Sequence, residues 1–378
     1  MSVRLCDPAT MRDDAWPADS AKLRAYTQAF TALGSARLIR NLRTRVMVLC
    51  AGEVALPVTI NDAEYDNAYV CSPYTAYALY SKEEMRLLES RLLRRALESV
   101  ADALGSVLKA ARINRMVQVN NWMLSTNLFP KKGLLPVAAI AKALAEALPE
   151  HYICFRSLNG WDGGDLREAF VAAGYQLVAS RQVYVYERLA ETWGTRSNAK
   201  HDRRLLRHSP YELVQHNEFV ENDYARMAEL YDMLYMRKYS RYNPAFTAEF
   251  MRLCHRSRAM HFFGLRGSDG ALDGVLGLFT IDGTTTAPVV GYDTERERRL
   301  GLYRLLMTLV FEHALEQGYD VNLSSGAAGF KRLRGGRPYI EYSAIFDRHL
   351  PLRRRLALSA LAAPVNSIGI PMMQRLQL

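Results

Sequence analysis

The chain has 378 residues, of which 49% are hydrophobic, and is long enough for two domains of moderate size, each with its own core. Lysine and arginine exceed aspartate and glutamate by 49 − 39 = 10, which fits an anionic small molecule, an anionic membrane surface or RNA without choosing among them. The first 23 residues include three aspartates by position 14 and no apolar run, and no later stretch approaches the roughly 20 uninterrupted apolar residues of a spanning helix. We therefore expect a cytoplasmic protein without a signal peptide.

The cysteines and histidines indicate neither a metal site nor a disulfide framework. The five cysteines are odd in number and scattered, with no Cys-x-x-Cys pair, which favours reduced thiols. Their positions are Cys6, Cys50, Cys71, Cys154 and Cys254. The eight histidines show no ligand spacing, and the adjacent pair Cys254-His255 does not share a helix face. The sequence therefore predicts no metal.

The first half of the chain alternates β-rich and helical segments. Three β-rich runs, TRVMVLCA, EVALPVTI and NAYVCSP, lie between Thr44 and Pro73 and predict an antiparallel meander. Leucines at helical spacing predict a long helix over Ser81–Ala111. The later segments are predicted as a strand (Asn114–Asn120), a helix (Pro136–Leu148), a strand (Tyr152–Leu158), a helix (Asp165–Ala173) and a strand (Gln176–Glu187). This alternation indicates a mixed sheet with helices.

The second half repeats this plan from about residue 190. A basic helix, NAKHDRRLLRHS, opens it after a cap near Ser197. The following segments are predicted as a strand (Tyr211–Gln215), a helical region broken near Pro244, three strands (MHFFGLRG, ALDGVLGLFT and APVVGYD), a helix (Leu300–Gln317), a strand (Tyr319–Ser324) and a last strand (Tyr339–Phe346). We predict an α+β protein with α/β-like mixed sheets, in two similar domains at 1–190 and 191–348, followed by a basic, apolar tail at 349–378.

The predicted helix over Leu300–Gln317 organises the second domain. It is apolar on almost every side, as is typical of a helix that is buried all round. At its start, near Arg298, Arg299 and Gly301, unpaired main-chain N–H groups and the positive end of the helix dipole favour an anion, and the glycine lets a phosphate approach. We interpret these three residues as a site for the phosphates of a donor; the alternative is a solvated charged turn.

Four features follow one another along the chain. They are a strand ending at Tyr292-Asp293, the run Arg298-x-x-Gly301-x-Tyr303, a long helix and another strand. The order resembles the GNAT acyltransferase fold, in which a [Gln/Arg]-x-x-Gly-x-[Gly/Ala] loop at the helix opening holds the pyrophosphate of coenzyme A. The chain matches the first two elements of that loop and departs at Tyr303. The resemblance implies an acyltransferase with an acyl thioester as co-substrate and no permanently bound cofactor.

Further segments resemble the FemAB/FemX-like branch, which contains two GNAT-like halves. They are the basic helix with Lys200, Arg203, Arg204 and Arg207, the run Lys238–Asn243 with Phe246 and Phe250 after it, the Leu-Gly-Leu helix start, and the pair Phe330-Lys331. The resemblance covers roughly Ser197–Tyr342 and reaches the first half in outline. It implies transfer of an acyl or aminoacyl group to an amine, from a coenzyme A thioester or from charged transfer RNA.

Acyl transfer to an amine requires a neutral amine, a positioned carbonyl and donors for the oxyanion. Lys331 is the first candidate for contacting the oxyanion or a phosphate, a role that the resemblance also implies; the alternative is a solvated lysine in a basic turn. Asp293 is a candidate proton acceptor, or else caps the helix or pairs with Arg296. Tyr303 is a candidate for protonating a leaving thiolate, and Phe330 for packing on the donor; both equally suit a core.

Polar groups at strand ends are candidates for binding the acceptor. Asn120, Asn121 and Trp122 follow a predicted strand of the first domain, a combination typical of a recognition surface and also of ordinary turns. If the halves pack together, this segment is expected to line an acceptor pocket between them. Tyr292 and Ser324, at strand ends of the second domain, complete the predicted substrate site. No histidine has the spacing of a nucleophile elbow, which argues against a serine nucleophile.

The tail places Arg353, Arg354 and Arg355 before an apolar segment that Pro364 and Pro371 interrupt. It is too short and interrupted to span a bilayer. An interfacial membrane segment, a cover for an acyl-chain tunnel and a terminal helix docked on the body all fit it. The protein is therefore expected in the cytoplasm, free or peripheral at the inner face of the membrane.

These observations predict an N-acyltransferase that moves an acyl group from acyl-CoA or an acyl-carrier protein to an amine, either an amino acid or a lipid-like amine. A ceramide-synthase-like member, with a role in lipid metabolism, fits the apolar tail and the 21 tyrosines. One alternative is an aminoacyl-tRNA-dependent transferase of the FemX type, with the basic helix on RNA phosphates. Another is a catalytically inactive GNAT-like binding module. No DNA partner is expected.

Overall fold

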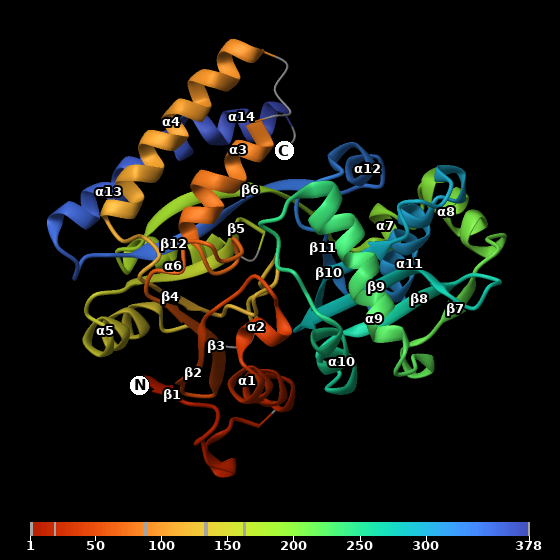
Figure 1. Ribbon diagram of the computed structural model, residues 1–378, viewed down its shortest axis with the longest axis horizontal. Coiled ribbons are helices and arrows are strands. Elements are labelled where there is room, and N and C mark those ends of the chain that lie inside the picture. Colours follow the sequence, from red (N-terminus) through yellow and green to blue (C-terminus); the bar gives the residue numbers. More distant parts are fainter. Residues whose placement is uncertain (1–2, 19, 86–89, 132–134, 162–163, 377–378) are drawn as a thin grey trace. The chain divides into compact units, whose positions relative to one another are not determined.

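The computed structural model describes residues 3–18, 20–85, 90–131, 135–161 and 164–376, and the chain divides into two compact units (Figure 1). Unit 1 comprises Met1–Arg181, Ser240–Ala245 and Ile340–Gln377. Unit 2 comprises Gln182–Tyr239 and Phe246–Tyr339. Each unit has its own core and a run of neighbouring strands, which is described below for each unit by itself.

Unit 1 is built on a sheet with the strand order β1-β2-β3-β4-β5-β12. Its strands are β1 (Val3–Cys6), β2 (Arg45–Ala51), β3 (Val54–Asn61), β4 (Met116–Val119), β5 (Tyr152–Asn159) and β12 (Arg337–Phe346). Its helices are α1 (Ala21–Leu33), α2 (Ser35–Leu38), α3 (Ser81–Met85), α4 (Arg91–Ala110), α5 (Val137–Ala147), α6 (Gly164–Ala172), α13 (Leu352–Pro364) and α14 (Ile370–Leu376), with shorter turns η1 (Asp13–Ala15), η2 (Thr75–Tyr80) and η6 (Val365–Gly369). The pairs are antiparallel except β4 with β5, which is parallel.

Unit 2 is built on a sheet with the order β7-β8-β9-β10-β11-β6. Its strands are the second half of β6 (Gln176–Tyr186), from Gln182 on, with β7 (Glu212–Val214), β8 (His261–Arg266), β9 (Leu272–Ile281), β10 (Thr284–Tyr292) and β11 (Asp320–Asn322). Its helices are α7 (Leu189–Thr192), α8 (Ser197–Arg207), α9 (Asp223–Tyr231), α10 (Ala248–Arg256), α11 (Leu302–Gln317) and α12 (Ala328–Leu333), with shorter turns η3 (His216–Glu218), η4 (Asp232–Tyr239) and η5 (Arg298–Leu300). Again one pair is parallel, β10 with β11.

The two sheets share one topology, which confirms the predicted pair of similar α+β halves. In each, four strands run antiparallel, the fourth is parallel to the fifth, and the sixth is antiparallel to the fifth. The sixth strand of unit 1 is β12, from the end of the chain, whereas that of unit 2 is β6, from its middle. The compact units are therefore not contiguous stretches of sequence, and the linear domain boundaries at 190 and 348 stay a prediction.

The buried cores follow the predicted apolar segments. In unit 2 the core surrounds α11, whose buried residues lie on every side of the helix, because Leu305 to Phe311 are all inaccessible. In unit 1 one cluster lies between the sheet and α5, and a second joins α4, α13 and the sheet. The prediction of a central buried helix is confirmed, with its start at Leu302 after the turn η5.

Some local predictions were wrong. The run NAYVCSP is not a strand but a turn, in which the Asn67 side chain exchanges hydrogen bonds with the main chain of Arg43 at 2.7 and 2.8 Å and so replaces a ladder. The single helix predicted over Ser81–Ala111 contains two helices, α3 and α4, and residues 86–89 between them lie outside the described residues. Strand β1 and helix α1 lie in a segment that no periodic pattern singled out.

Candidate active site

The parallel strands β10 and β11 separate part-way along their length. Their ladder pairs Thr284–Thr286 with Asp320–Asn322, but β10 continues to Tyr292. The register of β10 against β9 also shifts just after Thr286, next to Pro288, which has no N–H to donate. Beyond Thr286 the β11-facing edge of β10 lies outside the ladder. An extended group can pair with main-chain atoms there as an added strand would.

The opening of α11 lies in the loop that follows β10. Gly301 is the N-cap residue, with φ of 65°, and the described residues place no side-chain cap on this helix end. Arg298 and Arg299 are exposed in the turn before it, and Arg299 forms an ion pair with Glu297. The uncapped N–H groups and Arg298 give this end a positive potential, which Glu297 offsets in part. This is the geometry that the sequence predicted for a phosphate site.

Aromatic side chains gather beside this helix opening. Tyr303, in the first turn of α11, meets Phe330 of α12 edge-on, with ring centroids 5.1 Å apart, and Tyr292 lies 6.4 Å from Tyr303. The Lys238 ammonium donates to the Tyr292 hydroxyl at 3.3 Å. Burial, with smaller contributions from Tyr239 and Tyr292, raises the pKa of Tyr303. Tyr303 is therefore a neutral phenol that keeps its proton at physiological pH.

Lys331 is buried and contacts the loop that follows β11. Its ammonium donates to the carbonyl oxygens of Leu323, Ser324 and Ser325 at 2.7, 3.2 and 2.8 Å. All its three N–H donors thus have main-chain partners. Because the peptides are planar and trans, the N–H groups of Ser325 and Gly326 point away from the ammonium. The structure shows Lys331 positioning this loop, and its predicted contact with an oxyanion stays a prediction.

A buried carboxylate, Asp202 of α8, joins the three helices around the opening. It accepts hydrogen bonds from Arg334, just after α12, at 2.7 and 2.9 Å, and from Arg304 in the first turn of α11. The Arg334 guanidinium in turn lies 3.5 Å from the centroid of the Phe330 ring. Asp202 therefore fixes both the opening of α11 and the position of Phe330. The sequence analysis missed it, although a lone acid within the basic helix was the available signal.

Asp293 is tied to arginine rather than free to take a proton. Arg226 donates to one of its oxygens at 2.7 Å and the Glu295 N–H to the other at 2.9 Å. Burial acts to raise the pKa of Asp293, but the hydrogen bond from Glu295 and the ion pair with Arg226 outweigh it and lower the pKa. The partner considered from the sequence, Arg296, instead bonds Asp269 and Asp273 at 2.9 Å each. A carboxylate so stabilised is a weak base.

The predicted acceptor residues lie in two different places. Ser324, in unit 2, adopts φ of 59° and gives its carbonyl to Lys331. Asn120, Asn121 and Trp122, in unit 1, are buried, and their polar groups are used within that unit. Asn121, for example, donates to the Thr59 hydroxyl at 2.8 Å. The structure gives these three residues a structural role, and a part in binding stays a prediction.

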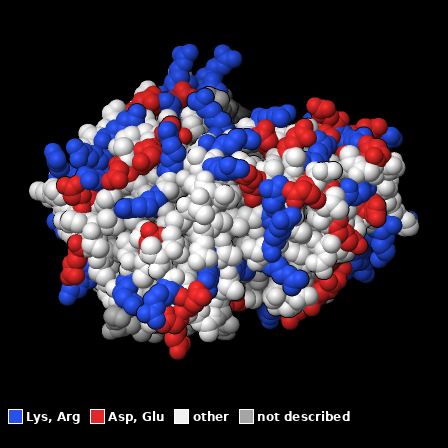
Figure 2. Space-filling view, turned by 60° about the horizontal axis from the view of Figure 1, so that its bottom comes forward, with Lys and Arg blue, Asp and Glu red and all other residues white. Residues whose placement is uncertain are grey.

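The basic helix α8 is only partly solvated. Arg203 forms an ion pair with Glu312 at 2.7 Å and lies 4.6 Å from the centroid of the Trp193 ring, whereas Lys200, Arg204 and Arg207 are exposed. Figure 2 shows one face of the molecule, on which basic and acidic side chains are interspersed. On this face the positive excess is not gathered into one patch. The structure thus offers no focused groove for RNA there.

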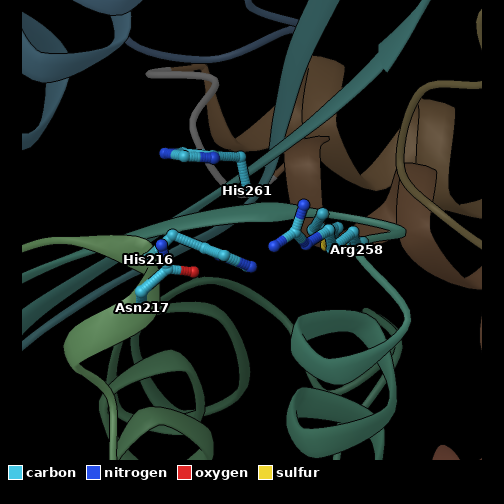
Figure 3. Close-up of a pocket in the computed structure, with 5 residues that line it drawn as sticks. His216, Asn217, Arg258 and His261 are labelled. Carbon is cyan, nitrogen blue, oxygen red and sulfur yellow. The ribbon is translucent and has the colours of Figure 1, made fainter.

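A separate pocket of about 190 Å³ is lined by His216, Asn217, Arg258, Met260 and His261 (Figure 3). It belongs to a series of stacked rings: His216 lies 4.9 Å from His261, which lies 4.7 Å from His313. His313 is ten residues beyond Tyr303 on α11, or about 15 Å along the helix. This pocket is therefore remote from the helix opening. Among the described residues no cluster of histidine, cysteine or acidic side chains could hold a metal ion.

Comparison with known proteins identifies the domain that carries this site. Residues 194–332 match the family model described as an acetyltransferase (GNAT) domain. No curated protein matches the chain. Similar solved structures include FemX, which is 11% identical with a TM-score of 0.46 and covers 60% of this chain and 79% of its own. Another is L-PGS from Bacillus licheniformis, which is 14% identical with a TM-score of 0.43 and covers 60% of this chain and 78% of its own. A tandem GNAT protein from the clavulanic acid biosynthesis pathway covers 91% of this chain and 98% of its own, with 12% identity and a TM-score of 0.39.

These likenesses concern the fold and carry no argument about substrate. The matched domain contains α8, the separating strands, the α11 opening, the aromatic cluster and Lys331. The predicted resemblance and the predicted enzyme class are confirmed at this level. Residues 194–332 are therefore a GNAT-type acetyltransferase domain by their match to the family model.

Proposed function

We propose that unit 2 transfers an acyl group from acyl-CoA to an amine, with Arg298, Arg299 and Gly301 at the donor phosphates. The separation of β10 from β11 carries this proposal, because it leaves an open strand edge that leads to an uncapped helix start. The diphosphate of the donor would meet the N–H groups of α11, and its extended arm would pair with β10.

The transfer step uses the groups around Tyr303. The neutral amine attacks the thioester carbonyl, the new C–N bond forms, and the C–S bond breaks with the thiolate as leaving group. Tyr303 gives its phenolic proton to the thiolate and recovers one from solvent, while the amine loses its proton to water. The N–H groups of Ser325 and Gly326, turned outward by Lys331, are the donors proposed for the oxyanion. Asp293 acts through Arg226 as a positioning group.

The acceptor proposed is an amine with an apolar portion. Phe330, Tyr292 and Tyr303 present rings beside the helix opening, and Tyr239 is 57% exposed nearby on η4. Aromatic side chains supply large apolar contact area with few polar demands. A lipid-like amine, or an amino acid with an apolar side chain, suits this surface better than a highly charged acceptor.

The test is amide formation from a series of acyl-CoA thioesters and a panel of amines, followed by mass spectrometry and by release of free thiol. Tyr303→Phe should lower kcat about tenfold, or about 1.4 kcal/mol, with the thioester KM unchanged. Tyr319→Phe, a tyrosine beyond the other end of α11, should alter neither value. No amide together with no thioester binding would remove the proposal. Activity that depends on charged tRNA and disappears with RNase would assign the donor to RNA instead.

A further inference from the structure

The last helical segment of the chain, from Leu352 onward, contains no acidic residue. Its charges are Arg353, Arg354, Arg355 and Arg375, and its other residues are apolar, small or uncharged polar. By length and composition Leu352–Arg375 is a helix able to cross a membrane, yet only 22% of its most apolar window is buried. An apolar, cationic helix that the protein leaves mostly uncovered requires an explanation.

The inner face of this segment is fixed to unit 1. Arg354 is buried and donates to the carbonyl oxygens of Ala111 and Glu150 at 2.9 and 2.6 Å. Leu358 and Leu361 are inaccessible in the cluster shared with α4. Asn366 accepts from the Ala179 N–H at 2.9 Å and donates to the Leu177 carbonyl at 2.7 Å. The helix therefore has a defined orientation, and its opposite face is presented outward.

The outward face repeats at helical spacing along the whole segment. Its exposed positions are Leu352, Arg355, Leu356, Ser359, Ala360, Ala363, Ser367, Ile368, Pro371, Gln374 and Arg375, with Arg353 at its margin. Intervals of three and four residues place such positions on one side of a helix. Leu352, Leu356 and Ile368 are 64%, 59% and 57% exposed. The face therefore combines large uncovered apolar side chains with arginines and no counter-charge.

Helix α4 also exposes apolar side chains and arginines, together with the acid Asp102. It packs against α13 within unit 1, and the two lie together, away from β1 (Figure 1). Leu92 and Val100 of α4 are 83% and 57% exposed, and Arg91 and Arg95 are exposed beside them. Two neighbouring helices of unit 1 thus each expose apolar side chains with arginine.

We propose that the outward face of α13, η6 and α14 binds the surface of a bilayer containing anionic lipids, as an interfacial helix. Arginines meet the lipid phosphates while leucine and isoleucine enter the boundary between headgroups and acyl chains. The segment lies on the membrane and does not span it, because its inner face keeps Arg354, Asn366 and two leucines in the protein. The inference concerns unit 1 and does not depend on the acyl transfer proposed for unit 2.

The test is sedimentation of the full chain with vesicles of phosphatidylcholine alone or with about one third phosphatidylglycerol. Binding should require the anionic lipid and weaken as salt rises from about 0.1 M to about 1 M, which shortens the Debye length from about 10 to about 3 Å. The pair Arg353→Gln and Arg355→Gln, and separately the pair Leu356→Gln and Ile368→Gln, should each reduce binding at least tenfold. Val171→Gln on α6, an equally exposed apolar position at 55%, is the matched control and should bind normally.

Each result has a defined consequence. Equal binding to both vesicle types would overturn the proposal. The same holds if Val171→Gln reduces vesicle binding as much as the test pairs do. Resistance to extraction by alkaline carbonate, which indicates a spanning helix, would also overturn it. Self-association that the Leu356→Gln and Ile368→Gln pair abolishes, without vesicle binding, would assign the face to a second copy of the chain. Transfer to a soluble amine without vesicles should be unchanged in all these variants, which separates this outcome from failure of the proposed function.

Discussion

The two units use one topology and treat the helix between their parallel strands in opposite ways. In unit 1 that helix is α5, between β4 and β5, and in unit 2 it is α11, between β10 and β11. The approach to α5 is buried, with Met123, Leu124, Leu128 and Phe129 all in the core. The approach to α11 is an exposed charged turn. The two units therefore differ in the chain that leads toward this helix, which is buried up to Phe129 in unit 1 and exposed at Arg298 and Arg299 in unit 2.

Asparagine side chains hold the buried stretch between β4 and Phe129 in unit 1. Asn120 donates to the Leu128 carbonyl at 2.9 Å, and the Asn127 carboxamide oxygen accepts from the Trp122 N–H at 3.0 Å. The Asn127 N–H donates to the Ser157 hydroxyl of β5 at 3.0 Å, so this loop contacts that strand. Unit 2 instead places Gly301 and two arginines at the equivalent point. We infer that only unit 2 binds a donor, and four predictions test the contrast.

The largest effect is expected from removing buried ion pairs. Asp202→Asn in unit 2 and Glu341→Gln in unit 1, where Glu341 bonds Arg181 at 2.8 Å, each leave a buried guanidinium uncompensated. Each should lower the free energy of unfolding by about 3–5 kcal/mol. Chemical denaturation measures this. Only Asp202→Asn should also raise the thioester KM, because only it releases Phe330 and α11; an equal rise with Glu341→Gln would refute the contrast.

A smaller effect is expected from two glycines at the two ends of α11. Gly301 and Gly318 have nearly the same conformation, with φ of 65° and 67°. Aspartate at either position incurs roughly 1–2 kcal/mol of backbone strain, but at the N-terminus it interacts favourably with the helix dipole. Gly301→Asp should lower kcat/KM for the thioester about 100-fold, or about 2.7 kcal/mol, by repelling the donor phosphates. Gly318→Asp should keep full activity and be the less stable variant; the reverse ranking would exclude a phosphate at Gly301.

The next largest effect is expected from removing positive charge near the N-termini of α11 and α5. Arg298→Gln together with Arg299→Gln should raise the thioester KM about tenfold and leave kcat unchanged, since phosphate binding is equal in the ground and transition states. The matched change near α5 in unit 1, Lys131→Gln, should have no effect on either constant. Steady-state kinetics at low and high salt measures both. A KM that responds to Lys131 would mean that unit 1 also contacts the donor.

Much of the fold was predictable because its signals are local. The apolar circumference of α11 and the β-rich runs around it depend on neighbouring residues, and the predicted elements there match the structure. The exchange of β6 and β12 was not predictable, because strand partners so far apart in sequence leave no periodic pattern. NAYVCSP failed for a related reason, since Asn67 satisfies main-chain groups of Arg43, 24 residues away.

The candidate site was predictable where it depends on the main chain and not where it depends on partners. The helix opening at Arg298, Arg299 and Gly301 was predicted because a helix start has a sequence signature, and its binding of a phosphate stays a prediction. Asp202 and Arg334, separated by 132 residues, meet only in the fold. The partners of Lys331 could not be predicted either. Spacing identifies a lysine after a strand, but it does not show that the ammonium donates to three carbonyl oxygens just after that strand.

The last prediction concerns acid stability and the ring series of unit 2, where a single substitution is expected to change the free energy of unfolding by about 1 kcal/mol. Burial, with the neighbouring His255, lowers the pKa of His216 to about 4, and burial with His313 lowers that of His261 to about 4. Both groups have pKa values near 6.5 when unfolded, so between pH 6.5 and 4 the unfolded chain binds more protons. The free energy of unfolding of unit 2 therefore falls as the pH falls through this window, by on the order of 2 kcal/mol from pH 7 to pH 5 after allowance for solvent screening.

His261→Gln should roughly halve this dependence, because it removes one of the two groups and no hydrogen bond of its ring is part of the described network. His201→Gln, at an exposed position on α8, should leave it unchanged. Hydrogen exchange resolved by segment, at pH 7 and pH 5, distinguishes the units. Burial also lowers the pKa values of His151 and His349 in unit 1, but only the two histidines of unit 2 reach about 4, so unit 2 should open first on acidification. If unit 1 opened first, its own groups would determine the acid sensitivity, and the stacked histidines of unit 2 would have no measurable effect on stability.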